Sequence, residues 1–142
     1  MSKTYTNPET IGLHAGWRKD ENTNSVAVPI HQTTSFQFDD TEHAANLFAL
    51  SEPGYIYTRL NNPTNDVLEK RLASMDGGIG AVATAGGTAA ISTSILTLLK
   101  IGDHIVASNS LYGGTYNMFN VMLPRLNIKT TFVALKNRMS IK

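Results

Sequence analysis

The sequence predicts an α/β fold in which helices flank a parallel sheet. From Pro63 onward, segments with apolar residues at helical spacing alternate with short apolar and β-branched runs, and glycine or proline separates them. Strands that alternate with helices along a chain form parallel sheets through right-handed crossovers. The 142 residues and their 42% hydrophobic content are enough for one ordinary domain with a core.

The first part of the chain predicts less regular structure. Residues 1 to about 35 are polar and show neither helical nor strand periodicity, so we expect an extended arm. A short helix follows, with Asp40 or Thr41 as its N-cap and an end before Pro53. Residues 55–65 combine aromatic residues with turn formers, which indicates an extended stretch and then a turn.

The regular part begins with a helix beyond Pro63, which Gly77 and Gly78 bring to an end. Its apolar face consists of Val67, Leu68, Leu72 and Met75. The next elements are a strand at Ala81–Thr84, a turn at Ala85–Thr88, a helix with Ile91, Ile95, Leu98 and Leu99 on one face, and a break at Gly102. A strand at His104–Ala107, a loop to Gly114, a helix at Thr115–Leu123 closed by Pro124, and a strand at Lys129–Ala134 complete the pattern.

Charge and cysteine content limit the classes of partner and site. Lys plus Arg number 12 and Asp plus Glu 11, so the net charge of +1 gives no electrostatic reason to expect nucleic acid or an anionic membrane. The chain has no cysteine, which excludes a disulfide framework and thiolate metal sites and is compatible with a reducing compartment. No stretch is long and apolar enough for a signal peptide or a membrane span, and we expect a cytoplasmic protein.

Metal binding and serine hydrolysis are not expected. The four histidines have no metal-ligand spacing, and no serine lies in a GxSxG context. These histidines are His14, His31, His43 and His104.

Thr84–Thr88 is the first candidate binding segment, because it connects a predicted strand to a predicted helix. The free N–H groups and the dipole of a helix N-terminus favour an anion. Gly86 and Gly87 let the backbone close on a phosphate, and Thr88 adds a hydroxyl donor. The alternative is that the glycines only make a tight connection, since the segment matches neither the Walker pattern nor GxGxxG.

Tyr57 and Arg59 form the second candidate, and Tyr112 is the third. In an extended segment Tyr57 and Arg59 share a face, so a phenol and a guanidinium can converge on one phosphate or carboxylate. The alternative is a surface arginine stacked on a tyrosine. Tyr112 follows a predicted strand at the sheet end where open α/β folds bind ligands, so its ring can lie against a flat cofactor. The alternative is a turn tyrosine packed on its own loop.

Five segments occur in an order that resembles the Cys/Met-metabolism family of pyridoxal 5'-phosphate (PLP) enzymes. They are VPIHQTTSF, FDDTEHAANLFAL, YIYTRLNNPTNDVLEKRLASMDGG, GTAAI and GDHIVASNSLYGGTYNMF. The resemblance runs from about Glu9 to Val133, and DDTEHAANLFAL and SLYGGTYNMF are most similar to the O-acetylhomoserine sulfhydrylase branch. Residues 134–142 match no motif of the family, whose members continue with an acidic turn after the segment that ends at Val133.

The resemblance implies the aspartate-aminotransferase-like (fold type I) architecture, with a large PLP-binding domain that begins in this chain. Residues 1–60 are then an arm and short helix that reach a neighbouring subunit, and residues 61–142 are the first part of the PLP-binding domain. The resemblance implies that Tyr57 and Arg59 bind the PLP phosphate of the neighbouring subunit and that the turn Gly86–Thr88 binds the subunit's own PLP phosphate. It also implies that Tyr112 stacks on the pyridine ring and can help to expel the γ-leaving group. Gly86 departs from many relatives, which carry serine there.

The implied activity is γ-replacement on O-acetylhomoserine in a homo-oligomer, with sulfide or methanethiol as second substrate and homocysteine or methionine as product. Methionine γ-lyase and cystathionine γ-synthase share every motif quoted above, and a non-catalytic fragment is a further alternative. The family's cofactor-binding lysine, the aspartate that pairs with the pyridine nitrogen and the arginine that binds the substrate carboxylate have no counterpart in these 142 residues. We therefore expect the chain by itself to be inactive.

Overall fold

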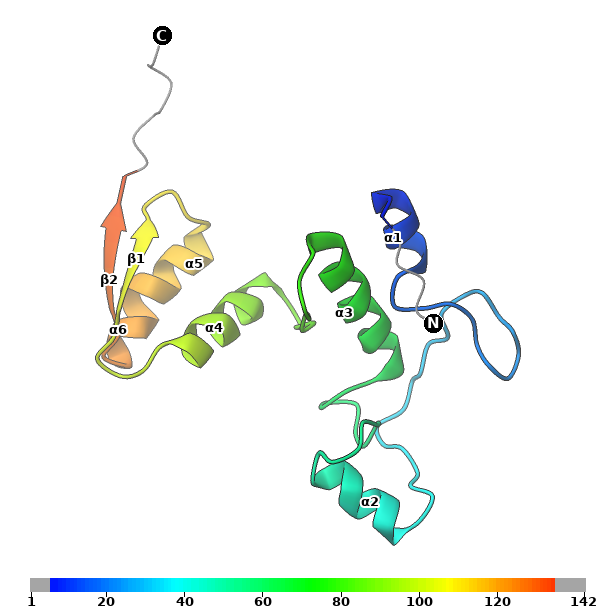
Figure 1. Ribbon diagram of the computed structural model, residues 1–142. Helices are drawn as coiled ribbons and strands as arrows, with labels where there is room; N and C mark the ends of the chain where they lie inside the picture. Colours follow the sequence, from blue (N-terminus) through cyan, green and yellow to red (C-terminus); the bar gives the residue numbers. More distant parts are fainter. Residues whose placement is uncertain (1–5, 135–142) are drawn as a thin grey trace. The chain divides into compact units, whose positions relative to one another are not determined.

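The computed structural model describes residues 6–134 (Figure 1). The chain divides into two compact units, Met1–Ala83 and Thr84–Lys142. The sequence predicts a different division, into an arm that reaches a neighbouring subunit (residues 1–60) and the start of the PLP-binding domain (residues 61–142). That division remains a prediction. Apart from Ala134, the tail that did not align lies outside the described residues.

In its described part, the first unit contains the helices α1 (Pro8–His14), α2 (Thr41–Phe48) and α3 (Pro63–Asp76) (Figure 1). Asp40 is the N-cap of α2, where its Oδ1 accepts from the N–H of His43 at 2.8 Å. Gly77 ends α3 in the left-handed conformation, with φ of 67°. The predicted positions of both helices are confirmed, because local capping chemistry decided where each begins or ends.

Helix α1 lies within residues 1–35, which were predicted to be an extended arm. It was not predicted because this segment has no periodic spacing of apolar residues. The Oδ1 of Asn7 accepts from the N–H groups of Glu9 at 2.9 Å and Thr10 at 3.2 Å. Pro8 occupies the first helical position, where its missing N–H has no cost. The Asn-Pro-Glu start is thus a helix signal that does not depend on an apolar face, and α1 has no buried residue.

The contact between the end of α1 and α3 requires glycine at position 16. Gly16 has φ of 74°, and a Cβ there would lie 2.8 Å from the Val67 carbonyl oxygen and 2.9 Å from Lys70 Cβ. Next to it, the buried Ala15 accepts at its carbonyl from Arg71 Nε at 3.0 Å. The backbone therefore lies directly on α3.

The second unit contains one parallel strand pair with helices. In the described residues its elements are α4 (Gly87–Leu98), β1 (His104–Ser108), α5 (Gly113–Asn117), the π-helical turn η1 (Met118–Met122), α6 (Leu123–Arg125) and β2 (Lys129–Val133). His104 pairs with Lys129 and Ser108 with Val133 in a parallel register. The predicted combination of a parallel sheet and flanking helices is confirmed.

Helix α5 continues through η1 into α6, past the proline that was predicted to close it. The N–H of Leu123 donates to the carbonyl of Met118, one residue further back than in an α-helix. Pro124 is the second residue of α6 and has no N–H to donate, but the carbonyl of Phe119, five residues earlier, accepts from the Thr130 hydroxyl at 3.2 Å. The wider π-turn lets the helix continue through Arg125.

The predicted strand Ala81–Thr84 is wrong. These residues have no regular secondary structure, and no strand lies beside them in the described part of the chain. The N–H of Ala83 donates instead to Oε1 of Glu69 at 2.8 Å, and Val82 is 79% exposed. A short apolar run becomes a strand only when another chain segment pairs with its backbone.

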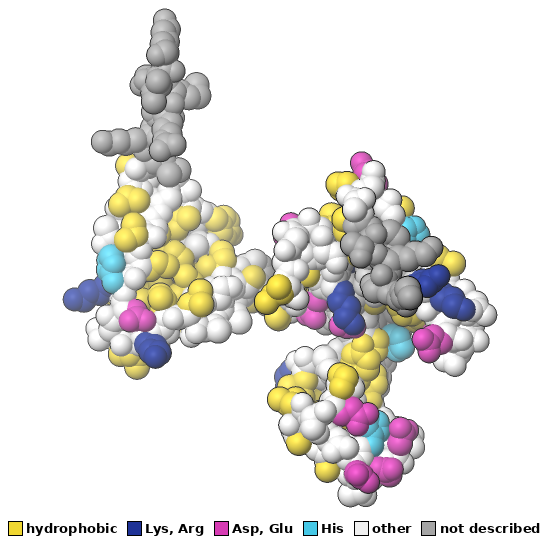
Figure 2. Space-filling view, in the orientation of Figure 1, with side chains coloured by type: hydrophobic (Ala, Val, Ile, Leu, Met, Phe, Trp, Pro, Cys, Tyr) yellow, Lys and Arg dark blue, Asp and Glu magenta, His cyan; other side chains and the backbone are white. Residues whose placement is uncertain are grey.

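The core of the second unit lies between the helices and one face of the strand pair. Its buried residues are Met118, Phe119, Leu123 and Ile128, and the partly buried residues against them are Ile91, Ile95, Leu99, Ile105, Ala107, Leu111 and Phe132. Val106 alternates with the core-facing residues of β1 and is 62% exposed, so the opposite sheet face is uncovered in the described residues. Leu98 was predicted to share the face of Ile91 but is 79% exposed. Figure 2 shows hydrophobic side chains gathered on the surface of this unit.

Candidate functional site

The first turn of α4 combines Gly86, Gly87 and Thr88, all of which are exposed. Gly86 is the N-cap, its backbone is extended with φ of 179°, and no side chain caps the helix. A Cβ at Gly86 or Gly87 would meet no atom within 4 Å. The first N–H groups of a helix have no partner within the helix, so this turn can receive an anion from the open space in front of it.

Tyr112 directly precedes α5, and its side chain is 78% exposed. Its carbonyl accepts from the N–H of Tyr116 at 2.9 Å. The ring lies over Gly114, where a Cβ would stand only 2.7 Å from Tyr112 Cε1. The tyrosine thus packs on its own loop in this structure, while most of its ring remains open to solvent.

The second unit brings these two candidates to one end of its sheet. Helices α4 and α5 contact each other, and both run against the direction of the strands (Figure 1). The Ser92 hydroxyl, one turn after Thr88, bonds to the Thr88 carbonyl at 2.8 Å and to Met118 Sδ at 2.9 Å. The beginnings of α4 and α5 therefore lie toward the carboxyl end of the strands, where open α/β folds bind ligands.

Tyr57 and Arg59 lie together in the first unit, but the predicted extended geometry is wrong for Arg59. Arg59 lies in a turn, in which the N–H groups of Leu60 and Asn61 donate to the Tyr57 carbonyl at 2.8 Å and 3.1 Å. The guanidinium carbon of Arg59 is 5.2 Å from the centroid of the Tyr57 ring, and both residues are exposed. Tyr57 forms an isolated antiparallel bridge with Ser35. This is the arginine–tyrosine contact that the alternative interpretation predicted, and a guanidinium in such a cation–π contact can still donate its N–H groups to a phosphate or carboxylate.

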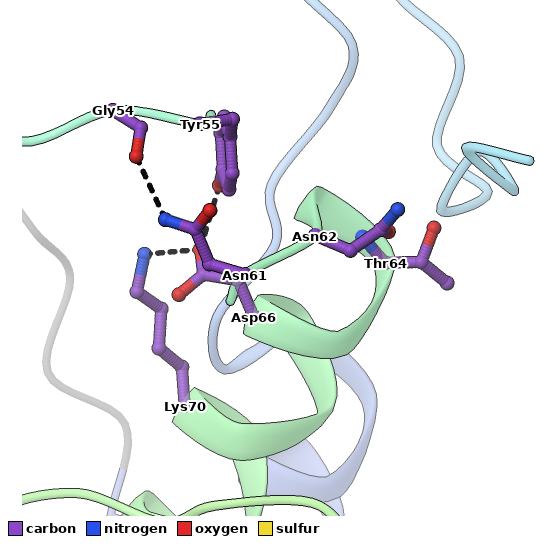
Figure 3. A network of polar contacts seen from close by, with 7 residues as sticks. All are labelled: Gly54, Tyr55, Asn61, Asn62, Thr64, Asp66 and Lys70. Carbon is purple, nitrogen blue, oxygen red and sulfur yellow. Dashed lines mark hydrogen bonds and ion pairs between the residues drawn. The ribbon is translucent and has the colours of Figure 1, made fainter. Parts of the chain in front are cut away.

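Polar side chains that were not among the predicted site residues hold this segment in place. Asn62 is 4% exposed, and its Nδ2 donates to the carbonyl of His31 at 2.9 Å and to the Thr58 hydroxyl at 3.0 Å. Its Oδ1 caps α3 by accepting from the N–H of Thr64 at 2.9 Å (Figure 3). The Thr64 hydroxyl accepts from the N–H of His31 at 2.9 Å and donates to the carbonyl of Pro29 at 3.2 Å. The Asn-Pro-Thr run is typical of a helix start, but it does not predict that its side chains bond to His31 and Pro29.

Thr58 stands between the two candidate residues and is bonded on both sides. Its N–H donates to the carbonyl of Thr34 at 2.8 Å, and its hydroxyl donates to the carbonyl of Thr33. The same hydroxyl accepts from Asn62. The backbone that carries Tyr57 and Arg59 is therefore fixed at the residue between them.

A second polar group lies on the neighbouring face of α3. The Tyr55 hydroxyl donates to Oδ2 of Asp66 at 3.1 Å, and Lys70 Nζ binds the same oxygen at 2.6 Å (Figure 3). Burial, and then the negative charge of Asp66, raises the pKa of Tyr55 above 10.0. The Tyr55 phenol remains protonated at neutral pH and acts as a structural donor.

Neither a candidate metal site nor a membrane-spanning helix occurs in residues 6–134. No three His, Asp or Glu side chains of this range form a group that could hold a metal ion. His104 Nε2 lies 2.8 Å from the Thr131 hydroxyl, and His43 Nδ1 accepts from the N–H of Asp39 at 3.1 Å. No helix of the described range has the length and apolarity needed to cross a membrane.

The profile of the Cys/Met metabolism PLP-dependent enzymes matches residues 9–142. The chain belongs to this family. The match includes residues 134–142, where no family motif was recognised from the sequence. The family that the motifs predicted is therefore confirmed, and its cofactor is PLP.

Sulfhydrylases are among the similar curated proteins. Sulfhydrylase FUB7 of Fusarium oxysporum is 56% identical over 131 residues, which cover 92% of this chain and 30% of that protein. The O-acetyl-L-homoserine sulfhydrylase of Leptospira meyeri is 56% identical over 126 residues, which cover 89% of this chain and 28% of that protein. The chain thus spans less than a third of the length of these relatives.

A crystal structure supports the fold. A Campylobacter jejuni protein assigned as an O-acetylhomoserine (thiol)-lyase, which contains N'-pyridoxyl-lysine-5'-monophosphate, matches with a TM-score of 0.86 and 37% identity. The match covers 92% of this chain and 32% of that chain. The predicted fold class, the beginning of a fold type I PLP-binding domain, is confirmed.

Proposed function

We propose that this chain is the N-terminal part of a PLP-dependent transferase that replaces the acetate of O-acetylhomoserine with sulfide or methanethiol, giving homocysteine or methionine. The sulfhydrylases at 56% identity support this branch over the lyase and cystathionine synthase alternatives. The structural observation that carries the proposal is the first turn of α4, which has no side-chain cap and faces open space.

The residues present fit the phosphate of PLP. The N–H groups of Gly86 and Gly87 and the hydroxyl of Thr88 would bind the phosphate, because a helix N-terminus favours an anion. A serine would also fit at position 86, because a Cβ there meets no atom within 4 Å. Tyr57 and Arg59 are assigned to the phosphate in the neighbouring subunit, and this role is supported by their exposure, which leaves both side chains accessible to a second subunit.

Tyr112 is the proposed catalytic residue of this chain. Bound PLP supplies an electron sink that makes the substrate protons near the amino group acidic. The exposed ring of Tyr112 can stack on the pyridine ring, and its hydroxyl can hold the proton that assists departure of the acetate. The ring lies over Gly114 and Tyr112 is 78% exposed, so a flat cofactor can approach the ring in this position.

The assignment of Tyr57 and Arg59 to another subunit requires a homo-oligomer with active sites shared across a dimer interface. We place this oligomer in the cytoplasm. The chain by itself is proposed to bind PLP at most weakly and to have no turnover, because the cofactor-binding lysine expected from the family has no counterpart in it.

A chimeric enzyme tests the proposal. Residues 9–133 of this chain replace the matching segment of the Leptospira meyeri sulfhydrylase, which is 56% identical. We expect bound PLP and homocysteine formation from O-acetylhomoserine and sulfide within about tenfold of the parent. A folded chimera without PLP, or one that eliminates the side chain instead of replacing its leaving group, would contradict the proposal.

A further inference from the structure

Two consecutive glycines at the start of α5 have different surroundings. A Cβ on Gly113 would meet no atom within 4 Å. A Cβ on Gly114 would lie 2.7 Å from Cε1, 3.3 Å from Cδ1 and 3.7 Å from Cζ of Tyr112. The Tyr112 ring therefore occupies the space that a side chain at position 114 would need, and only that one of the two glycines is in contact with it.

The backbone around this contact is held independently of the ring. The carbonyl of Tyr112 accepts from the N–H of Tyr116 at 2.9 Å, and Thr115 is buried at 6% exposure. The Tyr112 side chain is 78% exposed and can turn toward solvent. A methyl group at position 114 would consequently displace the ring and leave the helix intact, because alanine also favours a helix over glycine.

We propose that Gly114 is a positioning residue that determines where the Tyr112 ring stands over the first turn of α5. Ordinary contact between carbon atoms is about 3.5–4.0 Å, so a Cβ at 114 moves the ring by roughly 1 Å. A displacement of that size can cost about a hundredfold in rate when the displaced group takes part in the reaction. This consequence for catalysis rests on the proposed role of Tyr112, whereas the displacement itself does not.

The test compares Gly114→Ala with Gly113→Ala in the chimeric enzyme. Both substitutions add one methyl group to the same helical turn, but only the methyl group at position 114 would contact the Tyr112 ring. We expect Gly114→Ala to lower kcat about tenfold to a hundredfold and to change KM for O-acetylhomoserine by less than about twofold. Gly113→Ala should keep kcat within about twofold of the unmodified chimera.

A direct readout follows the ring without turnover. In chimera labelled with 3-fluorotyrosine, the ¹⁹F resonance that is lost in Tyr112→Phe reports on residue 112. We expect this resonance to shift in Gly114→Ala and to stay in place in Gly113→Ala. In a Tyr112→Ala background, Gly114→Ala should have no further effect on kcat, since it acts through the ring.

Two results would overturn the inference. The first is an unmoved ¹⁹F resonance in Gly114→Ala, and the second is an equal loss of kcat in the Tyr112→Ala background. Failure of the proposed function gives a different pattern. The unmodified chimera would then form no homocysteine, or Tyr112→Ala would retain full turnover, while the resonance of residue 112 still shifts in Gly114→Ala.

Discussion

The side-chain amide of Asn62 donates to the carbonyl of His31, which lies 31 residues earlier in the chain, at 2.9 Å. The same amide caps α3 and bonds to Thr58, the residue between Tyr57 and Arg59. One buried side chain thus joins the start of a helix, a distant segment and the backbone of the candidate phosphate-binding pair.

Replacing Asn62 should loosen this junction. Asn62→Ala removes an N-cap worth about 1 kcal/mol and leaves polar groups unsatisfied at a further cost of about 1–3 kcal/mol. Two amides should then exchange with solvent at least about tenfold faster, as measured by NMR: that of Thr64, which donates to Asn62 Oδ1, and that of His31, which donates to the Thr64 hydroxyl. Asn65→Ala, an exposed position in the same helical turn, is the matched control and should leave exchange unchanged. Equal exchange in both variants would show that Asn62 does not hold the junction.

Tyr55 should make stability fall at high pH. Burial and then the negative charge of Asp66 raise the pKa of Tyr55 in the folded chain. The protonated phenol therefore adds to the free energy of unfolding. This stabilisation is fully present below the unfolded pKa of about 10 and is lost as the pH rises through the folded pKa. The urea midpoint should therefore fall more steeply above about pH 10 in the unmodified chain than in Tyr55→Phe. Parallel curves for the two proteins would refute this role.

Arg59 should contribute to cofactor retention in the chimeric enzyme. Arg59→Ala removes a charge-assisted phosphate contact worth roughly 1.5–3 kcal/mol, so the Kd for PLP should rise about tenfold to a hundredfold. Arg59→Lys keeps the positive charge, so its Kd for PLP should lie between those of the unmodified chimera and of Arg59→Ala. Arg125→Ala, an exposed arginine of the second unit, is the control. Unchanged PLP affinity in Arg59→Ala would remove Arg59 from the site.

The hydroxyl of Tyr112 should matter for turnover and not for cofactor binding. Tyr112→Phe keeps the ring face, so PLP is retained, while the loss of a proton-transferring group costs about a hundredfold or more in kcat. Tyr116→Phe is the matched control, because the Tyr116 ring stacks on Phe132 at 4.4 Å and that contact survives the change. Full turnover in Tyr112→Phe would leave Tyr112 with stacking alone.

The chain by itself should not carry PLP on a defined lysine. After incubation with PLP and reduction with borohydride, we expect scattered, substoichiometric labelling in mass spectra and no homocysteine formation. The uncovered face at Val106 should also make the isolated chain prone to aggregation, since parallel sheets are normally covered on both faces. Stoichiometric labelling of one lysine together with turnover would contradict this expectation.

Local signals account for most of the elements that were predicted correctly. Asp40, Asn62 and Gly77 are caps whose chemistry acts within one helical turn, and the spacing of apolar residues placed α4 and β1. Helix α1 was missed because its Asn-Pro-Glu start has no apolar face behind it. The residues 81–84 were predicted as a strand because they are apolar, yet pairing depends on a neighbouring segment.

The sequence by itself determined the family, the parallel α/β pattern and the identity of the candidate residues, because motif order and periodicity are properties of neighbouring positions. Only the tertiary structure decided which backbone groups Asn62 bonds, that Tyr112 rests on Gly114, and that the far face of the strand pair is open. These contacts depend on the direction in which each side chain points and on how the elements pack. The spacing of residues along the chain does not determine the distance between two of their atoms.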